Sequence, residues 1–231
     1  MNRAKVIVHM HTSIDGKIDG VYGRQAGGRI SGAFYSEELF RLSNTNANGS
    51  TTVGMYAAKG HPDLSKYETT GIDYSDWIPD ITSETWDVSF DRKGKMGWEV
   101  NYFEYGGHKN RAIEVLTEQA SKAYLAFLQS MEIPYIVCGT KDLNLEMALE
   151  KLNKYFGIQA ISLAGGAIIN GAFLKAHLVD EISLVVTPYV SGDSEIKSAF
   201  DTLGTFVDDK FMIKDVKKLA DGGIHLMYTK A

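Results

Sequence analysis

The chain has 231 residues, with 24 Lys and Arg against 29 Asp and Glu and a formal net charge of −5. This length supports a sizeable core and predicts a single domain over 1–231. One cysteine, Cys138, excludes a disulfide framework and a cysteine-rich zinc module. The acidic balance argues against nucleic-acid binding. Because a membrane span and a signal peptide are also missing, we expect a soluble, cytoplasmic protein.

The N-terminal part predicts a strand followed by a helix. β-branched residues indicate a strand over 6–10, which ends at the turn sequence Ser-Ile-Asp-Gly of 13–16. The helix is expected to begin near Ser31 or Ser36, its apolar positions being Phe34, Leu39, Phe40 and Leu42. The Glu37-Glu38 pair would then lie in its first turn, where the helix dipole favours acids.

The next part of the chain is less regular. Residues 51–53 predict a short second strand that meets Gly54. From about 57 to 107, Gly, Pro, Asp and aromatic residues are frequent and periodicity is poor, so we expect an irregular excursion beside a sheet. Within it, 87–91 and 98–105 predict a hairpin that turns at the Lys-Gly-Lys between them.

The C-terminal half alternates strands with helices. The expected strands cover 112–116, 135–138, 158–163 and 181–186, and the expected helices cover 118–131, 145–156 and 167–176. This alternation is typical of crossover units on a parallel sheet. Residues 210–218 and 224–229 flank Asp-Gly-Gly and predict an antiparallel hairpin. The fold class is therefore α/β, a three-layer αβα sandwich whose mixed sheet is mostly parallel with an antiparallel C-terminal hairpin.

Ligands of open α/β sheets bind beyond the carboxyl ends of the strands. The candidate segments are therefore 13–17, 53–56, 139–142, 165–167 and 187–188. Gly165-Gly166 is the most informative, because a helix is expected to begin at Ala167 and the free amides of a helix N-terminus attract phosphate. A tight turn without a ligand remains the alternative. Neither a Gly-x-Gly-x-x-Gly fingerprint nor a P-loop is present.

Asp15 and two histidines are further candidates. An acid at a strand end can donate a proton or hydrogen-bond a ligand, although an Asp-Gly turn often bonds its own backbone. His9 and His11 lie on one face of the first strand, a pattern found in zinc hydrolases. Because the other histidines are scattered, we expect no metal and favour hydrogen-bonded histidines beside a pocket. Cys138 is expected to be a buried, inert thiol.

Two stretches carry a family resemblance. Ser-Ile-Asp-Gly-Lys-Ile at 13–18 resembles the Ser-Leu-Asp-Gly-Lys-Ile signature of the riboflavin-biosynthesis reductases. Residues 158–192 resemble their C-terminal block, with Leu-Ala-Gly-Gly at 163–166, Asn-Gly-Ala-Phe-Leu at 170–174 and Leu-Val-Asp-Glu-Ile at 178–182. The chain is thus similar to the reductase domain of the bifunctional riboflavin deaminase-reductase, a relative of dihydrofolate reductase. Since no deaminase zinc motif precedes it, we expect a stand-alone reductase.

The resemblance implies an NADPH-dependent reductase, in which hydride passes to C1′ of a ribosylamino-pyrimidine phosphate. The implied cofactor contacts are Gly54, Gly139, Gly165, Gly166 and Ala167, with Arg92 for the 2′-phosphate of NADPH. The implied substrate contacts are Ser13 and Lys17, and Asp15 is the implied catalytic residue. Arg29 is the substrate contact that we expect to replace a family Arg in binding the phosphate, with Arg24 and Lys59 as alternatives. The resemblance also implies a homodimer.

Three places depart from the family pattern, and one of them is the stretch 42–48, which lacks the Arg that the family carries there. Ala164 stands where the family usually has Glu before the paired glycines. The family usually has Thr three residues after the glycine that ends the second strand. If that glycine is Gly54, the corresponding residue here is Ala57. Two other functions therefore stay open. One is a reductase of an unrelated small C=N or C=O substrate on the same fold, and the other is a nucleotide-binding protein without catalysis.

Overall fold

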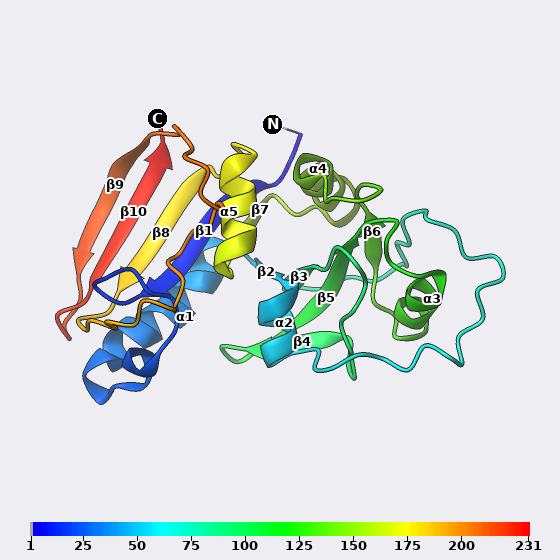
Figure 1. The fold of residues 1–231 in the computed structure, drawn as a ribbon, viewed down its shortest axis with the longest axis horizontal. Helices are drawn as coiled ribbons and strands as arrows, with labels where there is room; N and C mark the ends of the chain where they lie inside the picture. Colours follow the sequence, from blue (N-terminus) through cyan, green and yellow to red (C-terminus); the bar gives the residue numbers. More distant parts are fainter. Residues whose placement is uncertain (1) are drawn as a thin grey trace. The chain divides into compact units, whose positions relative to one another are not determined.

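The computed structural model describes residues 2–231 (Figure 1). Its elements are β1 (Lys5–Thr12), the 3₁₀ turns η1 (Val21–Arg24) and η2 (Ala26–Gly28), α1 (Arg29–Leu42), β2 (Thr45–Gly49), α2 (Ser50–Tyr56), β3 (Trp86–Phe90), β4 (Tyr102–Tyr105), β5 (His108–Leu116), α3 (Lys122–Ser130), β6 (Tyr135–Val137), α4 (Leu145–Phe156), β7 (Ala160–Leu163), α5 (Ala167–Lys175), β8 (Glu181–Val186), β9 (Phe211–Lys218) and β10 (Ile224–Lys230). Among the described residues, every helix is too short or too polar to cross a bilayer.

The chain divides into two compact units. The first unit contains Asn44–Gln159 and the N-terminal residues up to Ala4, and the second unit contains Lys5–Ser43 and Ala160–Ala231. The second unit therefore joins the beginning of the chain to its end. The stretches that carry the family resemblance, 13–18 and nearly all of 158–192, belong to this second unit.

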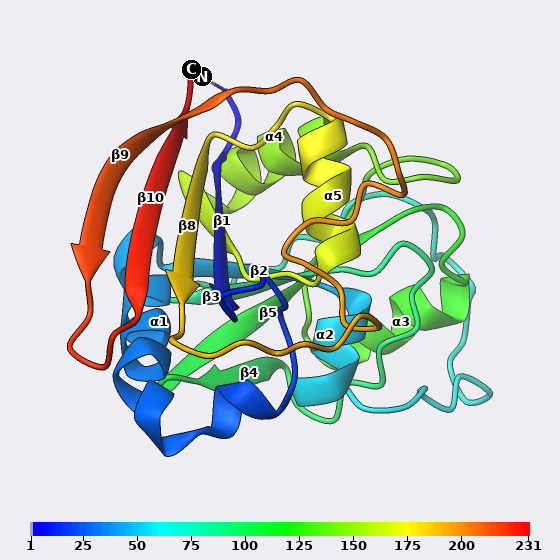
Figure 2. The ribbon, with the colours of Figure 1, turned by 60° about the vertical axis from the view of Figure 1, so that its left-hand side comes forward.

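The second unit has the strand order β7-β1-β8-β10-β9. Figure 2 shows β1, β8, β10 and β9 side by side in this order. β1 is parallel to β7 and to β8, with Val8 opposite Leu163 on one side and Ile182 on the other. β10 runs antiparallel to β8 and to β9. The mostly parallel arrangement with an antiparallel C-terminal hairpin is therefore confirmed. The carboxyl ends of β7, β1 and β8 consequently point to one edge of this sheet.

Helices cover both faces of the second unit's sheet. Successive side chains of a strand point to opposite faces. His9 of β1 bonds the carbonyl of Tyr35 in α1 at 2.9 Å. Met10 points the other way, where a Cβ on Gly165, just before α5, would lie 3.2 Å from its side chain. Layers of α1, sheet and α5 follow from this alternation, as the three-layer prediction requires.

The first unit repeats the layered plan. β3 is parallel to β2 and β5, and β5 also pairs with β6 in parallel and with β4 in antiparallel. Trp86 of β3 stacks edge-on with Phe156 of α4, whereas Glu114 of β5 meets Tyr124 of α3 on the other face. The core on that second face is formed by buried apolar side chains that include Val53, Trp98, Leu116, Leu125, Leu128 and Ile133.

The predicted second strand over 51–53 is wrong. The strand is β2 at Thr45–Gly49, and residues 51–53 lie in α2, so Gly54 is a helical residue rather than a strand-end glycine. β2 is rich in Asn, which has a poor strand propensity, but pairing with β3 and burial override it. Since the glycine ending this strand is Gly49, the third residue beyond it is Thr52, and the expected departure at Ala57 disappears.

The predicted hairpin over 87–105 is also wrong. β3 pairs with β2 and β5, while β4 pairs with β5 across Gly106-Gly107, both of which have positive φ. The Lys-Gly-Lys turn is used differently, because the amides of Lys95 and Met96 donate to the carboxylate of Asp91. The segment therefore folds back on the end of β3 instead of starting a second strand.

The placement of Glu37-Glu38 in a first helical turn is wrong as well. α1 begins earlier, at Arg29, and its first turn contains no acid. Asp221, in the turn between β9 and β10, takes that place by accepting bonds from the amide of Ser31 at 2.7 Å and from its hydroxyl. A cap that comes from 190 residues away leaves no local signal in the sequence.

Candidate active site

The second unit gathers several of the predicted residues at one sheet edge. Ser13, Asp15 and Lys17 follow β1, and Gly165-Gly166 follow β7. Thr187 follows β8, and its amide donates to the carbonyl of Thr12 at 2.8 Å. Because β1 lies between β7 and β8, the three loops leave neighbouring parallel strands on the same side. This edge is the candidate active site.

Asp15 connects two of these loops. Its carboxylate accepts hydrogen bonds from the hydroxyl of Ser13 at 2.6 Å and from the amides of Ser191 and Gly192 at 2.8 and 2.9 Å. The Ser13 hydroxyl, followed by the two amides, holds the pKa of Asp15 well below its ordinary value. The group is therefore ionised at neutral pH. It can position the loops and stabilise positive charge, but it is a poor proton donor.

The predicted substrate contacts differ in burial and in the hydrogen bonds that their side chains already make within the protein. Ser13 is buried and also accepts a bond from the amide of Lys17 at 3.0 Å. The ammonium of Lys17 donates to the carbonyl of Ile196 at 2.7 Å, which ties its charge to the loop after β8. Arg29 is exposed at the start of α1. Of these cations, Arg29 is the better placed to reach a ligand in solution.

The paired glycines end at an open helix N-terminus. Gly165 has φ +103°, and a Cβ there would press on Met10, so glycine fits the close approach of this loop to β1. Gly166 is the N-cap of α5, and within residues 2–231 no side-chain cap bonds the first turn of this helix. The positive end of the helix is thus available to an anion. These features fit the diphosphate of a nicotinamide dinucleotide.

The remaining predicted cofactor contacts belong to the first unit, where local structure accounts for each. Gly54 lies in α2. Gly139 follows β6 with φ +120°, and a Cβ there would overlap the carbonyl oxygen of Asp142. Arg92 follows β3 and forms a half-exposed ion pair with Asp142 at 2.8 Å. Their proposed roles toward a cofactor stay predictions.

His9 belongs to a buried hydrogen-bond network. Its Nδ1 is 2.9 Å from the Ser183 hydroxyl, which is 2.8 Å from Nε2 of His225. The Tyr35 carbonyl can only accept, so Nε2 of His9 carries the proton, Ser183 donates to Nδ1, and His225 donates to Ser183. Burial lowers the pKa of His9 to about 4. With both nitrogens occupied, His9 is a structural residue.

His11 and Thr187 are candidates that the sequence did not single out as a pair. Nε2 of His11 and Oγ1 of Thr187 are buried, and neither has a hydrogen-bond partner in residues 2–231. The sequence shows that His11 faces the same side as His9, but not that one histidine is satisfied and the other is not. That difference depends on α1 and β10, which contact His9 and its network from distant parts of the chain.

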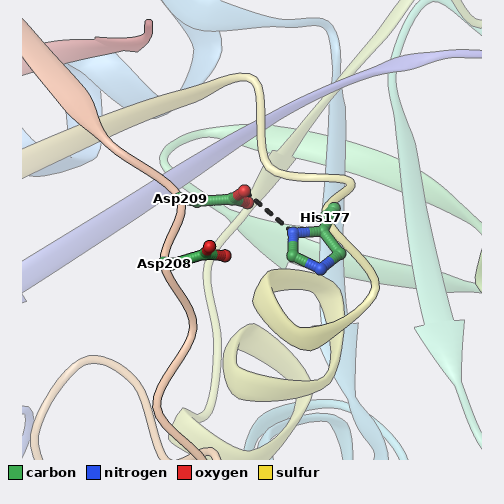
Figure 3. A group of neighbouring side chains, drawn as sticks. All are labelled: His177, Asp208 and Asp209. Atoms are coloured by element: carbon green, nitrogen blue, oxygen red, sulfur yellow. Dashed lines mark hydrogen bonds and ion pairs between the residues drawn. The ribbon is translucent and has the colours of Figure 1, made fainter.

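One group at the opposite sheet edge could in principle hold a metal ion. His177, Asp208 and Asp209 bring their ligand atoms within 4.8 Å of one another (Figure 3). Asp209, however, accepts from Nδ1 of His177 and from the ammonium of Lys230, each at 2.8 Å. Its negative charge is thereby compensated, and the group ties the end of β10 to the turn after α5.

The profile of the RibD C-terminal domain family matches residues 79–223, well over half of the chain. The 2,5-diamino-6-ribosylamino-4(3H)-pyrimidinone 5′-phosphate reductase of Methanothermobacter thermautotrophicus is 32% identical over 69 residues, which are 30% of this chain and 32% of that protein. The enzyme of the same name from Aquifex aeolicus is 31% identical over 80 residues, 35% of each protein. The matches thus span about a third of these curated relatives.

Solved structures share the fold. A pyrimidine reductase-like protein of Corynebacterium diphtheriae superposes with a TM-score of 0.70 at 15% identity, over 100% of this chain and 93% of the other. The riboflavin biosynthesis reductase Rib7 of Saccharomyces cerevisiae gives 0.62 at 14% identity, over 100% and 91%. At such identities these similarities concern the fold, and the family follows from the profile match. This chain belongs to the RibD C-terminal domain family.

Proposed function

We propose that this protein is an NADPH-dependent reductase of riboflavin biosynthesis, which transfers hydride to C1′ of a pyrimidine carrying a phosphoribosylamino group. Membership of the RibD C-terminal domain family and two relatives named as pyrimidinone phosphate reductases support this reaction. The observation that carries it is the uncapped N-terminus of α5 directly behind Gly165-Gly166, at the sheet edge where β1 ends in Ser-Ile-Asp-Gly-Lys.

The open helix end suits the cofactor's diphosphate. The amides that begin at Ala167 would bind its oxygens, and the glycines before them let a bulky anion approach the backbone. When bound, NADPH supplies the hydride, so the protein's own task is binding and orientation. By resemblance, Gly54 and Gly139 would contact the cofactor and Arg92 its 2′-phosphate.

The substrate would use the other residues of this edge. Exposed Arg29 offers a positive charge for the substrate's phosphate. Asp15, ionised and bonded to Ser13 and to the amides of Ser191 and Gly192, fixes the two loops beside the reacting carbon. Its negative charge would also stabilise an iminium form of the substrate.

The test is direct. Purified protein is mixed with NADPH and either 2,5-diamino-6-ribosylamino-4(3H)-pyrimidinone 5′-phosphate or 5-amino-6-(5-phosphoribosylamino)uracil, and oxidation is followed by absorbance at the nicotinamide band. We expect turnover with one of them and slower turnover with NADH. An unchanged melting temperature at millimolar NADPH would contradict the cofactor assignment, because a ligand that binds the native state raises it.

A second candidate rests on Ala164, which stands just before the paired glycines where the family usually has a carboxylate. A protein without that group could bind the dinucleotide without reducing this substrate. Thermal stabilisation by NADPH, together with no turnover of either pyrimidine, would favour this nucleotide-binding role or a reductase of another small C=N or C=O substrate.

A further inference from the structure

Two buried polar atoms at the candidate active site have no partner in residues 2–231. They are Nε2 of His11, the second-to-last residue of β1, and Oγ1 of Thr187, the first residue after β8. Thr187 is fully buried. Leaving a buried donor or acceptor unpaired destabilises a folded protein, so nearly all such groups are paired. Because both unpaired groups lie at the carboxyl ends of the neighbouring strands β1 and β8, we expect a polar ligand to supply their missing hydrogen-bond partners.

The two atoms belong to the same face of the sheet. His11 pairs in register with Val185 of β8, and Thr187 lies two residues further along the same side. Ser183, which lies two residues before Val185 and therefore on the same face of β8, indicates which face this is. Its hydroxyl bonds His9 on the face covered by α1. His11 and Thr187 are thus diagonal neighbours on adjacent strands, at the carboxyl edge.

Their neighbours on that face are bonded. His9 uses both ring nitrogens, and Ser183 joins His9 to His225. An imidazole and a hydroxyl thus occur twice on this face. His9 and Ser183 bond each other, whereas His11 and Thr187, which lie further along each chain segment, leave a nitrogen and an oxygen without a hydrogen-bond partner in residues 2–231. Burial alone does not explain this contrast, since Ser183 and Thr187 are both fully buried.

The surroundings indicate a flat, uncharged group. The His11 ring lies near two aromatic rings, with its centroid 5.7 Å from that of Tyr35 and 6.0 Å from that of Tyr22. Burial lowers the pKa of His11 although Asp221 acts against it, so the imidazole is neutral at pH 7. A neutral imidazole and a hydroxyl each donate or accept one bond, which suits an amide-like edge better than a phosphate.

Gly28 lies directly against this hydroxyl. A Cβ at this position would lie 2.6 Å from Oγ1 of Thr187. The backbone of Gly28 has φ −103° and ψ 11°, which alanine also adopts, so glycine is not required by the conformation. Glycine instead avoids a side chain that would press on the Thr187 hydroxyl.

We propose that His11 Nε2 and Thr187 Oγ1 bind the polar edge of the substrate's pyrimidine ring, where a side chain at position 28 would crowd the hydroxyl. The inference rests on the proposed function, because it assigns part of that substrate to residues outside the family signature. His11 and Thr187 are specificity-determining residues here, and hydride transfer itself needs neither.

The test compares Thr187→Val, His11→Phe and Gly28→Ala with wild type in steady-state assays with the pyrimidine phosphate and NADPH. Each variant should raise the KM for the pyrimidine about tenfold and leave the KM for NADPH unchanged. Thr187→Val should melt at the wild-type temperature or above it, because it removes an unpaired polar group. Ser183→Ala is the matched control, since it deletes a bonded hydroxyl from the same strand and face, and it should lower the melting temperature without changing either KM.

The outcomes separate the two claims. Wild-type turnover with unchanged pyrimidine KM in Thr187→Val and His11→Phe would overturn the inference and leave the proposed function intact. A lower melting temperature of Thr187→Val at wild-type KM would also overturn it, because the hydroxyl would then have a structural partner. If the wild-type protein binds NADPH but reduces neither pyrimidine, the proposed function and this inference fail together.

Discussion

Asp87 shows how one buried side chain sets a pH dependence. Its carboxyl is 1% exposed in β3 and is bonded by the side-chain amide of Asn48 at 3.2 Å. Burial, only partly opposed by that bond, raises the pKa of Asp87 from 3.8 to about 7. The folded state therefore holds this proton more tightly than the unfolded state does. The free energy of unfolding consequently falls as the pH rises from about 4 to about 7.

Asp87→Asn should remove this contribution. At pH 8 we expect the variant to be more stable than wild type by up to about 4 kcal/mol, and at pH 4 the two should be similar. Urea unfolding at pH 4, 6 and 8 measures the difference. Asp80→Asn, an exposed residue of the same unit, is the control. Parallel pH curves for wild type and Asp87→Asn would mean that Asp87 is ionised throughout.

For single residues, the sequence predicted where the side chains of the site lie better than it predicted their hydrogen bonds and charge. Ser13, Asp15 and Gly165-Gly166 all lie at the predicted sheet edge, and Cys138 is buried as expected. Whether a group is ionised or bonded, however, depends on residues far along the chain. The amides of Ser191 and Gly192 hold the charge of Asp15, which a turn signal alone could not show.

At the scale of single elements, α5 offers a sharp test of anion binding. Ile168 is 47% exposed in the first turn of this helix. Ile168→Asp should leave the melting temperature unchanged or raise it, because an acid favours a helix N-terminus. It should also raise the KM for NADPH about threefold to tenfold, since the carboxylate competes with and repels the diphosphate.

Ile168→Asn separates charge from shape, as it has the same size as Asp without the negative charge. We expect its KM for NADPH to stay close to the wild-type value. The salt dependence gives a second readout, because raising the ionic strength should reduce the difference between the two variants. Equal KM values for Asp and Asn at low salt would argue against a diphosphate at this helix end.

Element prediction succeeded where local signals agree with the final packing. α4 and the β9–β10 hairpin have the predicted bounds within a residue or two, because a regular apolar stripe and an Asp-Gly-Gly turn specify them locally. β2 failed, since Thr45–Gly49 is polar and becomes a strand only by pairing with β3. The start of α1 near Ser31 was predicted within two residues, but its cap was missed, because the capping residue is the distant Asp221.

At the scale of the whole molecule, β9 is the strand that raises the question of assembly. It pairs with β10 on one side and is an edge of the second unit's sheet. Its apolar side chains Met212, Ile213 and Val216 are exposed, and exposed apolar edge strands tend to pair with another chain. These features support the expectation of a homodimer.

The double variant Met212→Lys, Ile213→Lys should therefore be monomeric. Light scattering coupled to size exclusion should give twice 25.5 kDa for wild type and 25.5 kDa for the variant. Val190→Lys changes an equally exposed apolar residue on a loop of the same unit and should remain dimeric. A wild-type protein that elutes as a monomer at micromolar concentration would refute the prediction.

The order of strands in the second unit has a consequence for synthesis. β10 follows the other described strands in the chain but lies between β8 and β9, and Asp221, which caps α1, comes shortly before it. On the ribosome, β9 cannot join its sheet, and α1 cannot gain its cap, until residues 221–230 have been made and have left the exit tunnel. Nascent chains stalled before residue 221 should thus be cut by protease within 5–43, whereas Asn44–Gln159 has already emerged with all of its own strands.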